Sequence, residues 1–133
     1  MAVVTNAGGP GVMATDAVGD ADRLRLASFS ETTVTDLQET MPAEANVYNP
    51  VDVIGDADVD RLQSALDTTL ADGDVGSAVV ITAPTATLDF AALGGAVADT
   101  AAEHDVPVAV CLMGGETLAP ARETFRDRSI PSY

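Results

Sequence analysis

The chain of 133 residues contains no lysine and no tryptophan, one histidine, one cysteine and six basic residues, all arginine. Nucleic acids are bound largely through cationic contacts with phosphates, so six arginines against 21 acidic residues argue strongly against a nucleic-acid partner. The single cysteine excludes an internal disulfide and a multi-cysteine metal site. No apolar run reaches the roughly 18–20 residues of a membrane helix, and no basic segment opens a signal peptide. These absences predict a soluble, cytoplasmic protein with no membrane partner and no metal site of its own.

The formal net charge is −15, although 47% of the residues are hydrophobic. That much apolar material predicts a folded chain rather than a disordered acidic tail, and the length suits one domain. A charge of −15 destabilises a compact fold in dilute buffer, whereas about 1 M salt shortens the screening length to roughly 3 Å. The lysine-free composition, rich in aspartate, alanine and valine, is therefore interpreted as halophilic. An acidic protein adapted to ordinary salt is the alternative.

Short apolar segments alternate with helical patterns along the whole chain. Strands are expected at residues 2–5, 24–28, 77–82, 106–113 and 130–133, and 43–55 is expected to be a loop. Helices are expected at 11–22, after caps at Ser30 and Asp58, around 90–101 and around 118–125. This alternation predicts an α/β fold, a flavodoxin-like doubly wound parallel sheet of four to five strands in three layers. Residues 1–133 are expected to form one domain, excised from a larger multidomain chain because both ends fall inside strands.

The segment from Asn6 to Gly11, with glycines at 8, 9 and 11, joins the first predicted strand to the first helix. Glycines let the backbone bend sharply, and the free N–H groups of a helix start point at an anion. Neither the Walker A pattern nor the G-x-G-x-x-G pattern of dinucleotide sites is present. The segment is a candidate phosphate cradle, and a tight turn for helix packing is the alternative.

Two further segments fall at the same predicted edge of the sheet, where ligands of doubly wound folds bind. Pro50 restricts Asn49 to extended backbone, and Asn49 and Asp52 can bond nearby backbone groups. Gly114 and Gly115 follow another predicted strand and precede a helix. On pattern alone, both segments are more typical of turns than of ligand contacts.

No set of side chains suggests a catalytic residue. His104 lies between a helix and the strand beginning near residue 106, which is the opposite edge of the sheet, and is expected to be a solvated loop residue. Cys111 lies inside an apolar strand and is expected to be a buried small hydrophobe rather than a nucleophile.

Two longer motifs are specific enough to indicate a family. TNAGGPGVMATD at 5–16, followed by NPVDVIGDA at 49–57, resembles the C-terminal flavodoxin-like domain of NDP-forming acyl-CoA synthetases. These are ADP-forming acetate–CoA ligases, relatives of succinyl-CoA synthetase. The similarity continues through APT at 83–85 and GG at 114–115 to IPSY at 130–133, and so covers nearly the whole chain.

The resemblance implies a parent enzyme that interconverts acyl-CoA, ADP and phosphate with free acid, CoA and ATP, with Mg²⁺ as cofactor. In that family the phosphoryl group travels on a histidine of a neighbouring domain, and CoA-binding and ATP-grasp modules complete the enzyme. The phosphohistidine docks between the N-termini of two helices, one from each flavodoxin-like domain. The implied phosphate-binding residues are Asn6, Gly8, Gly9, Gly11 and Val12, and the supporting residues are Asn49, Asp52, Gly114 and Gly115.

The chain lacks the transferring histidine, so the isolated domain is expected to be catalytically inactive and to act with the other domains or subunits, in an assembly that can be oligomeric. The alternative is a regulatory, ligand-sensing domain of a synthetase-like protein acetyltransferase. A free-standing FMN-binding protein is disfavoured because the chain has two tyrosines and no tryptophan to stack on a flavin.

Overall fold

The computed structural model describes all residues 1–133, and its sheet has four parallel strands in the order β2-β1-β3-β4. The strands are β1 (Ala2–Thr5), β2 (Val51–Asp52), β3 (Ala78–Thr82) and β4 (Val108–Leu112). A parallel bridge from Ser132 to Val110 extends the sheet beyond β4. This is the strand order of a flavodoxin-like sheet, so the predicted fold class is confirmed.

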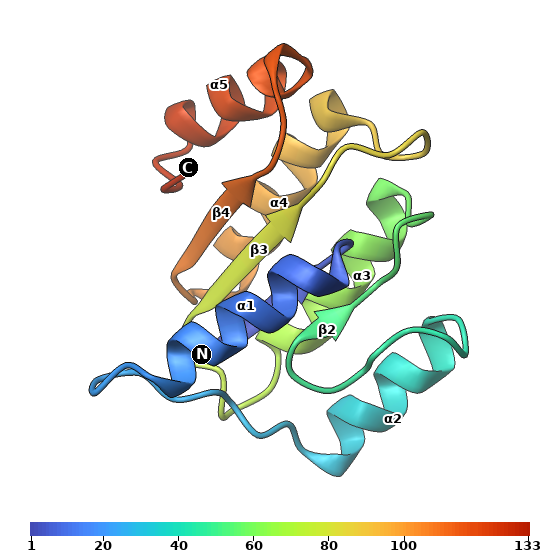
Figure 1. Ribbon diagram of the computed structural model, residues 1–133, viewed down its shortest axis with the longest axis vertical. Helices are drawn as coiled ribbons and strands as arrows, with labels where there is room; N and C mark the ends of the chain where they lie inside the picture. The colour runs from blue at the N-terminus through green and yellow to red at the C-terminus, as the bar shows by residue number, and fades with distance from the viewer.

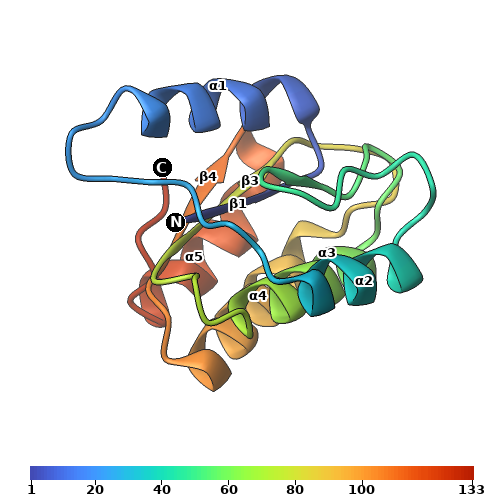
Figure 2. The same cartoon turned by 90° about the horizontal axis from the view of Figure 1, so that it is seen from below.

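The helices lie on both faces of this sheet (Figure 1). They are α1 (Gly8–Gly19), α2 (Glu31–Thr40), α3 (Val59–Leu70), α4 (Phe90–His104) and α5 (Ala119–Asp127), with a 3₁₀ turn η1 (Glu116–Leu118) before α5. In Figure 2, α1 covers one face by itself and the other helices cover the opposite face, which gives the three expected layers. No helix has both the length and the apolar character needed to cross a membrane.

The main core lies between the sheet and helices α3, α4 and α5. Its fully buried side chains include Leu62, Val97 and Phe125. Because side chains alternate along a strand, Ala109 and Cys111 of β4 face the α1 side instead, and both are only half-buried. The expectation that Cys111 is buried is therefore wrong, since a single helix does not cover the whole of this face.

Two helix starts follow directly from the sequence. The Ser30 hydroxyl accepts a hydrogen bond from the Thr33 amide (3.2 Å), and the Asp58 carboxylate accepts one from the Arg61 amide (2.9 Å). Each side chain satisfies an amide that a first helical turn leaves without a partner. The predicted caps of α2 and α3 are confirmed.

The strand beside β1 differs from the expectation. Residues 24–28 form no strand, and β2 lies instead at Val51–Asp52, inside the segment 43–55 expected to be a loop. Beyond these two residues, the Asn49 side chain bonds the edge of β1, accepting from the Val3 amide (3.0 Å) and donating to the Met1 carbonyl (2.9 Å). The strand has only two residues and directly follows Asn49-Pro50, which is typical of a turn, so the short apolar run at 51–54 does not stand out as a strand in the sequence.

Candidate functional site

The candidate site begins where β1 meets α1. The Thr5 hydroxyl accepts a hydrogen bond from the Ala7 amide (2.9 Å) and donates one to the Ala7 carbonyl (3.1 Å), which ends the strand and turns the chain. Helix α1 then begins at Gly8, three residues before the predicted start at Gly11. The glycines are therefore the first turn of the helix and not a loop that precedes it.

This early start decides which amides are free. The N-cap residue Ala7 has no side chain that could cap the helix, and the amides of Gly8 and Gly9 donate to no group of the chain. The Gly11 amide donates to the Ala7 carbonyl (3.1 Å) and Val12 lies one residue further into the helix, where amides bond the preceding turn. The structure thus corrects the predicted set, since only Gly8 and Gly9 can offer free N–H groups.

Asn6 holds the loop in place. Its side chain is 4% exposed, accepts a hydrogen bond from the Ala83 amide (2.8 Å) and donates one to the Ala83 carbonyl (2.9 Å). Ala83 directly follows β3, so this pair of bonds fastens the carboxyl ends of the two central strands together. The side chain predicted as a phosphate donor is therefore committed to positioning the backbone.

The three glycines of α1 differ in their surroundings. A Cβ on Gly11 would lie 2.8 Å from Cγ2 of Thr5, so only glycine lets α1 lie this close to β1. A Cβ on Gly8 would lie 2.7 Å from Oδ2 of Asp52, whereas a Cβ on Gly9 would meet nothing within 4 Å. Gly9 therefore faces open space at the helix N-terminus, where a ligand can approach.

Asp52 is an acidic group beside this N-terminus. One carboxylate oxygen accepts a hydrogen bond from the Ile54 amide (2.9 Å), and the other lies beside Gly8. A carboxylate there is stabilised by the positive end of the helix dipole, and it also repels an arriving anion. Of the two predicted supporting residues in this segment, Asp52 thus lies at the site, whereas Asn49 bonds Met1 and Val3 at the other end of β1.

The Gly114–Gly115 segment does not open a helix directly. Gly114 has a φ of 153°, and a Cβ there would lie 2.8 Å from Cγ of Pro84. The 3₁₀ turn η1 follows, and α5 begins only at Ala119. The segment is therefore a tight turn, as its pattern favours, and it packs the loop after β4 against the loop after β3.

The remaining reactive groups lie away from the glycines. His104 is the last residue of α4 and not a loop residue, and its Nε2 lies 2.7 Å from Oδ1 of Asp67. It occupies the opposite edge of the sheet, as expected. Hydrogen bonding to Arg25 holds the pKa of the Asp74 carboxyl well below its usual range, but this pair lies near the amino end of β1.

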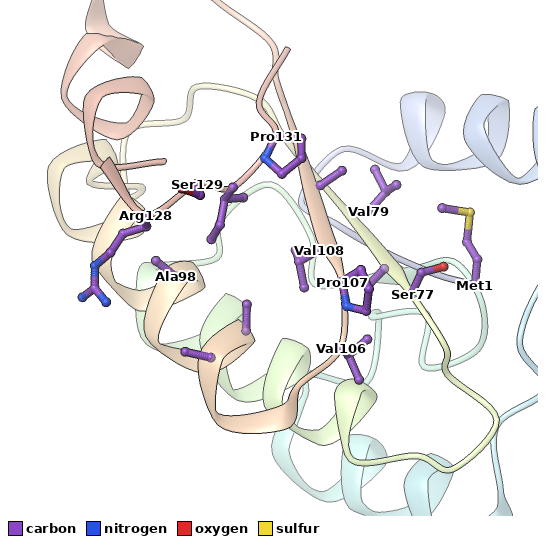
Figure 3. Close-up of a pocket in the computed structure, with 15 residues that line it drawn as sticks. Met1, Ser77, Val79, Ala98, Val106, Pro107, Val108, Arg128, Ser129 and Pro131 are labelled. Carbon is purple, nitrogen blue, oxygen red and sulfur yellow. The ribbon is translucent and has the colours of Figure 1, made fainter. Parts of the chain in front are cut away.

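The largest pocket also lies at that opposite edge (Figure 3). Its volume is about 490 Å³, and Val79, Ala98 and Val108 contribute to a mainly apolar lining. Arg128 lines it as well but is already paired with Asp99 (2.6 Å). Because none of the predicted site residues lines this pocket, we place the candidate site at the N-terminus of α1.

Relatives of known function match the whole chain. The chain is 38% identical to Acetate--CoA ligase [ADP-forming] I of Archaeoglobus fulgidus. It is 33% identical to subunit alpha of Acetate--CoA ligase [ADP-forming] II of Pyrococcus furiosus. Both matches cover 100% of this chain, but only 18% and 30% of those proteins. The chain thus spans less than a third of the length of these relatives.

Solved structures agree with the sequence comparison. The crystal structure of PH0766 from Pyrococcus horikoshii superposes with a TM-score of 0.90 at 29% identity, over 100% of this chain and 31% of that one. The dinucleotide-forming acetyl-coenzyme A synthetase 1 of Ca. Korarchaeum cryptofilum, in complex with phosphate and ADP, gives a TM-score of 0.88 at 28% identity, over 99% and 29%. The Ligase-CoA domain family matches residues 1–133, and the chain belongs to this family.

Proposed function

We propose that residues 1–133 are a domain of an ADP-forming acyl-CoA ligase that acts on acetate or a similar acid. In this proposal the N-terminus of α1 binds phosphate, or the phosphohistidine of a neighbouring domain, during phosphoryl transfer. The observation that carries the proposal is the pair of unbonded amides of Gly8 and Gly9 at an open helix start. The relatives named as ligases favour this function over a regulatory one.

The binding chemistry needs no cationic side chain. A helix N-terminus carries about half a positive charge, and two free N–H groups can donate to two oxygens of one phosphoryl group. The nearby Asp52 carboxylate disfavours a fully ionised phosphate, so a ligand that brings its own N–H or O–H donor fits better. A protonated phosphohistidine imidazole or a protonated phosphate meets this requirement.

The other reaction components belong to other domains in this proposal. The only histidine, His104, is at the wrong edge of the sheet to carry the phosphoryl group to α1. No group of three or more His, Cys, Asp or Glu side chains is arranged to hold Mg²⁺. We therefore assign ATP or ADP, Mg²⁺ and CoA to the neighbouring modules, and expect the isolated chain to show no acid- and CoA-dependent ATP turnover.

Titration of the ¹⁵N-labelled protein with inorganic phosphate tests the proposal by amide chemical shifts. We expect the resonances of Gly8 and Gly9 to move saturably, while those of Gly73 and Gly76, which lie outside this site, stay in place. Gly9→Asp should abolish the response, because the new carboxylate competes for the same amides, whereas Gly9→Asn should retain most of it. A uniform shift of all glycines, or equal behaviour of the two variants, would contradict the proposal.

A further inference from the structure

Three of the six arginines form ion pairs with aspartates within the domain. Arg25 pairs with Asp74, Arg61 with Asp56, and Arg128 with Asp99. In a chain with 21 acidic residues, a cationic side chain is expected to form such a pair. The exceptions are Arg23, which stands alone in the loop after α1, and two arginines of α5.

Arg122 and Arg126 are two of these exceptions, and they lie together. They occupy positions i and i+4 of α5, so their side chains share one face of the helix. Glu123 and Asp127 follow them directly in sequence, yet neither arginine makes an ion pair or a side-chain hydrogen bond. Both guanidinium groups thus remain available to a partner.

The two arginines border a hollow between α5 and the end of the sheet. The hollow has a volume of about 360 Å³ and is lined by Arg122, Arg126, Ile130 and Ser132. Ser132 belongs to the segment that pairs with β4, and its hydroxyl is without a hydrogen bond in the structure. Two arginines and one serine, whose polar side-chain groups bond no other group of the chain, therefore line the same hollow.

This chemistry fits carboxylates presented by another polypeptide. Arginine binds carboxylates through paired N–H donors and is enriched at protein interfaces. Sites for small ligands normally enclose most of the ligand, and a hollow lined by four residues, one of them the exposed Arg126, is too open for that. With a net charge of −15 the domain repels an acidic partner in general, so such a partner needs unpaired cations of the kind that Arg122 and Arg126 provide.

We propose that the α5 face bearing Arg122 and Arg126 docks an acidic segment of a neighbouring domain or subunit. The identity of that neighbour as part of a ligase rests on the proposed function, but the docking chemistry does not. In this arrangement each guanidinium binds a carboxylate of the segment, and the Ser132 hydroxyl adds a hydrogen bond. The surface is separate from the N-terminus of α1, so it acts in assembly and not in phosphoryl binding.

The absence of lysine provides a sharp test in the native assembly that contains residues 1–133. Arg122→Lys with Arg126→Lys introduces the only side-chain amines of the domain. A zero-length carbodiimide reagent joins an amine to a carboxylate only where the two are in contact. We expect mass spectrometry to find new cross-links from positions 122 and 126 to acidic residues outside residues 1–133. Arg23→Lys is the matched control, because Arg23 is also exposed and unpaired, and it should give none.

Several outcomes would overturn the docking proposal. These are cross-links confined to carboxylates of residues 1–133 in the same chain or in a second copy, equal cross-linking from the Arg23→Lys control, or no cross-links at all. Protection by inorganic phosphate would also overturn it, in favour of a small-anion site. As a second readout, Arg122→Glu with Arg126→Glu should weaken the assembly at least tenfold in dissociation constant while the phosphate response of Gly8 and Gly9 stays unchanged. Loss of the response in this variant would also overturn the proposal, because the two surfaces would not be separate. Absence of the response in the unsubstituted protein, with the cross-links still found, would instead contradict only the proposed function.

Discussion

At the scale of single residues, glycines that look equivalent in the sequence have different roles. Gly11 permits the close approach of α1 to Thr5, Gly8 leaves room for Asp52, and Gly9 faces open space. The sequence predicts that such a cluster is special, but it does not indicate which glycine is required for packing and which for access. That distinction depends on which neighbours each Cα faces, and these neighbours come from β1 and from the segment after Pro50.

Alanine substitutions separate the two roles. Gly11→Ala should lower the free energy of unfolding by about 1–2 kcal/mol, because its Cβ would overlap the Thr5 methyl group at 2.8 Å. Gly9→Ala, in the same helical turn, should be neutral or stabilise by up to about 1 kcal/mol through helix propensity. Urea unfolding of the two variants measures the difference, and equal stabilities would show that α1 is not tightly packed on β1.

Asn6 shows a limit of the sequence at this scale. An asparagine beside a glycine-rich helix start is well suited to bind a phosphate, and the sequence motif supports that interpretation. Both of its polar atoms instead bond Ala83, which is 77 residues away in the chain. No local pattern encodes a hydrogen bond of that separation, because it depends on the parallel pairing of β1 with β3.

At the scale of elements, the sequence predicts what local chemistry determines. The caps at Ser30 and Asp58 and the apolar segments of β3 and β4 are all found where the pattern places them. Helix α1 begins three residues earlier than the sequence predicts. Three glycines and a proline have low helix propensity, and close packing on β1 overrides it. The short strand β2 is not expected from the sequence because it has only two residues, too few to show a strand pattern, and follows the turn-like pair Asn49-Pro50.

The position of α2 depends on Asp72. This side chain is 7% exposed and accepts hydrogen bonds from the Ser30 amide (2.8 Å) and the Thr33 hydroxyl (2.7 Å), while its other oxygen accepts one from the Asp74 amide (2.9 Å). Burial raises the pKa of Asp72, but these hydrogen bonds outweigh burial, and the net effect lowers the pKa below its ordinary value of 3.8. The ionised carboxylate thus anchors the N-terminus of α2 to the loop after α3.

This arrangement predicts a specific dependence on pH. Because folding lowers the pKa of Asp72, its contribution is complete above the ordinary value of 3.8 and is lost as the pH falls through the lowered one. Asp72→Asn should therefore cost about 1–3 kcal/mol at pH 7 and should reduce the loss of stability between pH 7 and 3. Melting curves across this range measure the effect. Asp36→Asn, a substitution at an exposed position of α2, is the control. If both variants follow the parent curve, Asp72 does not anchor α2.

At the scale of the whole molecule, the main feature is the excess of negative charge. The three arginine–aspartate pairs engage only a few of the 21 acidic residues, so most carboxylates repel one another across the surface. This balance can be read from composition alone, because it does not depend on how the chain folds. The fold adds only the location of the unpaired cations.

Salt should therefore stabilise the domain strongly. We expect the melting temperature at pH 7 to rise steadily from low to multimolar NaCl, because screening weakens the repulsion that accompanies a net charge of −15. Near the isoelectric point of about 4.1 the same addition should have a much smaller effect. Calorimetry at both pH values measures the change in melting temperature with salt. A melting temperature at pH 7 that does not change with salt concentration would rule out halophilic adaptation.

Helix α1 has two roles that no other element has. It is the sole cover of one side of the sheet, and its first turn carries the open amides (Figure 2). Occupancy of those amides and integrity of the hydrophobic layer beneath are consequently linked by mass action: an anion that binds only the folded form must also protect the interior from unfolding. Amide hydrogens deep in β1 and β3 should then exchange more slowly whenever phosphate is bound, although the ligand never touches them.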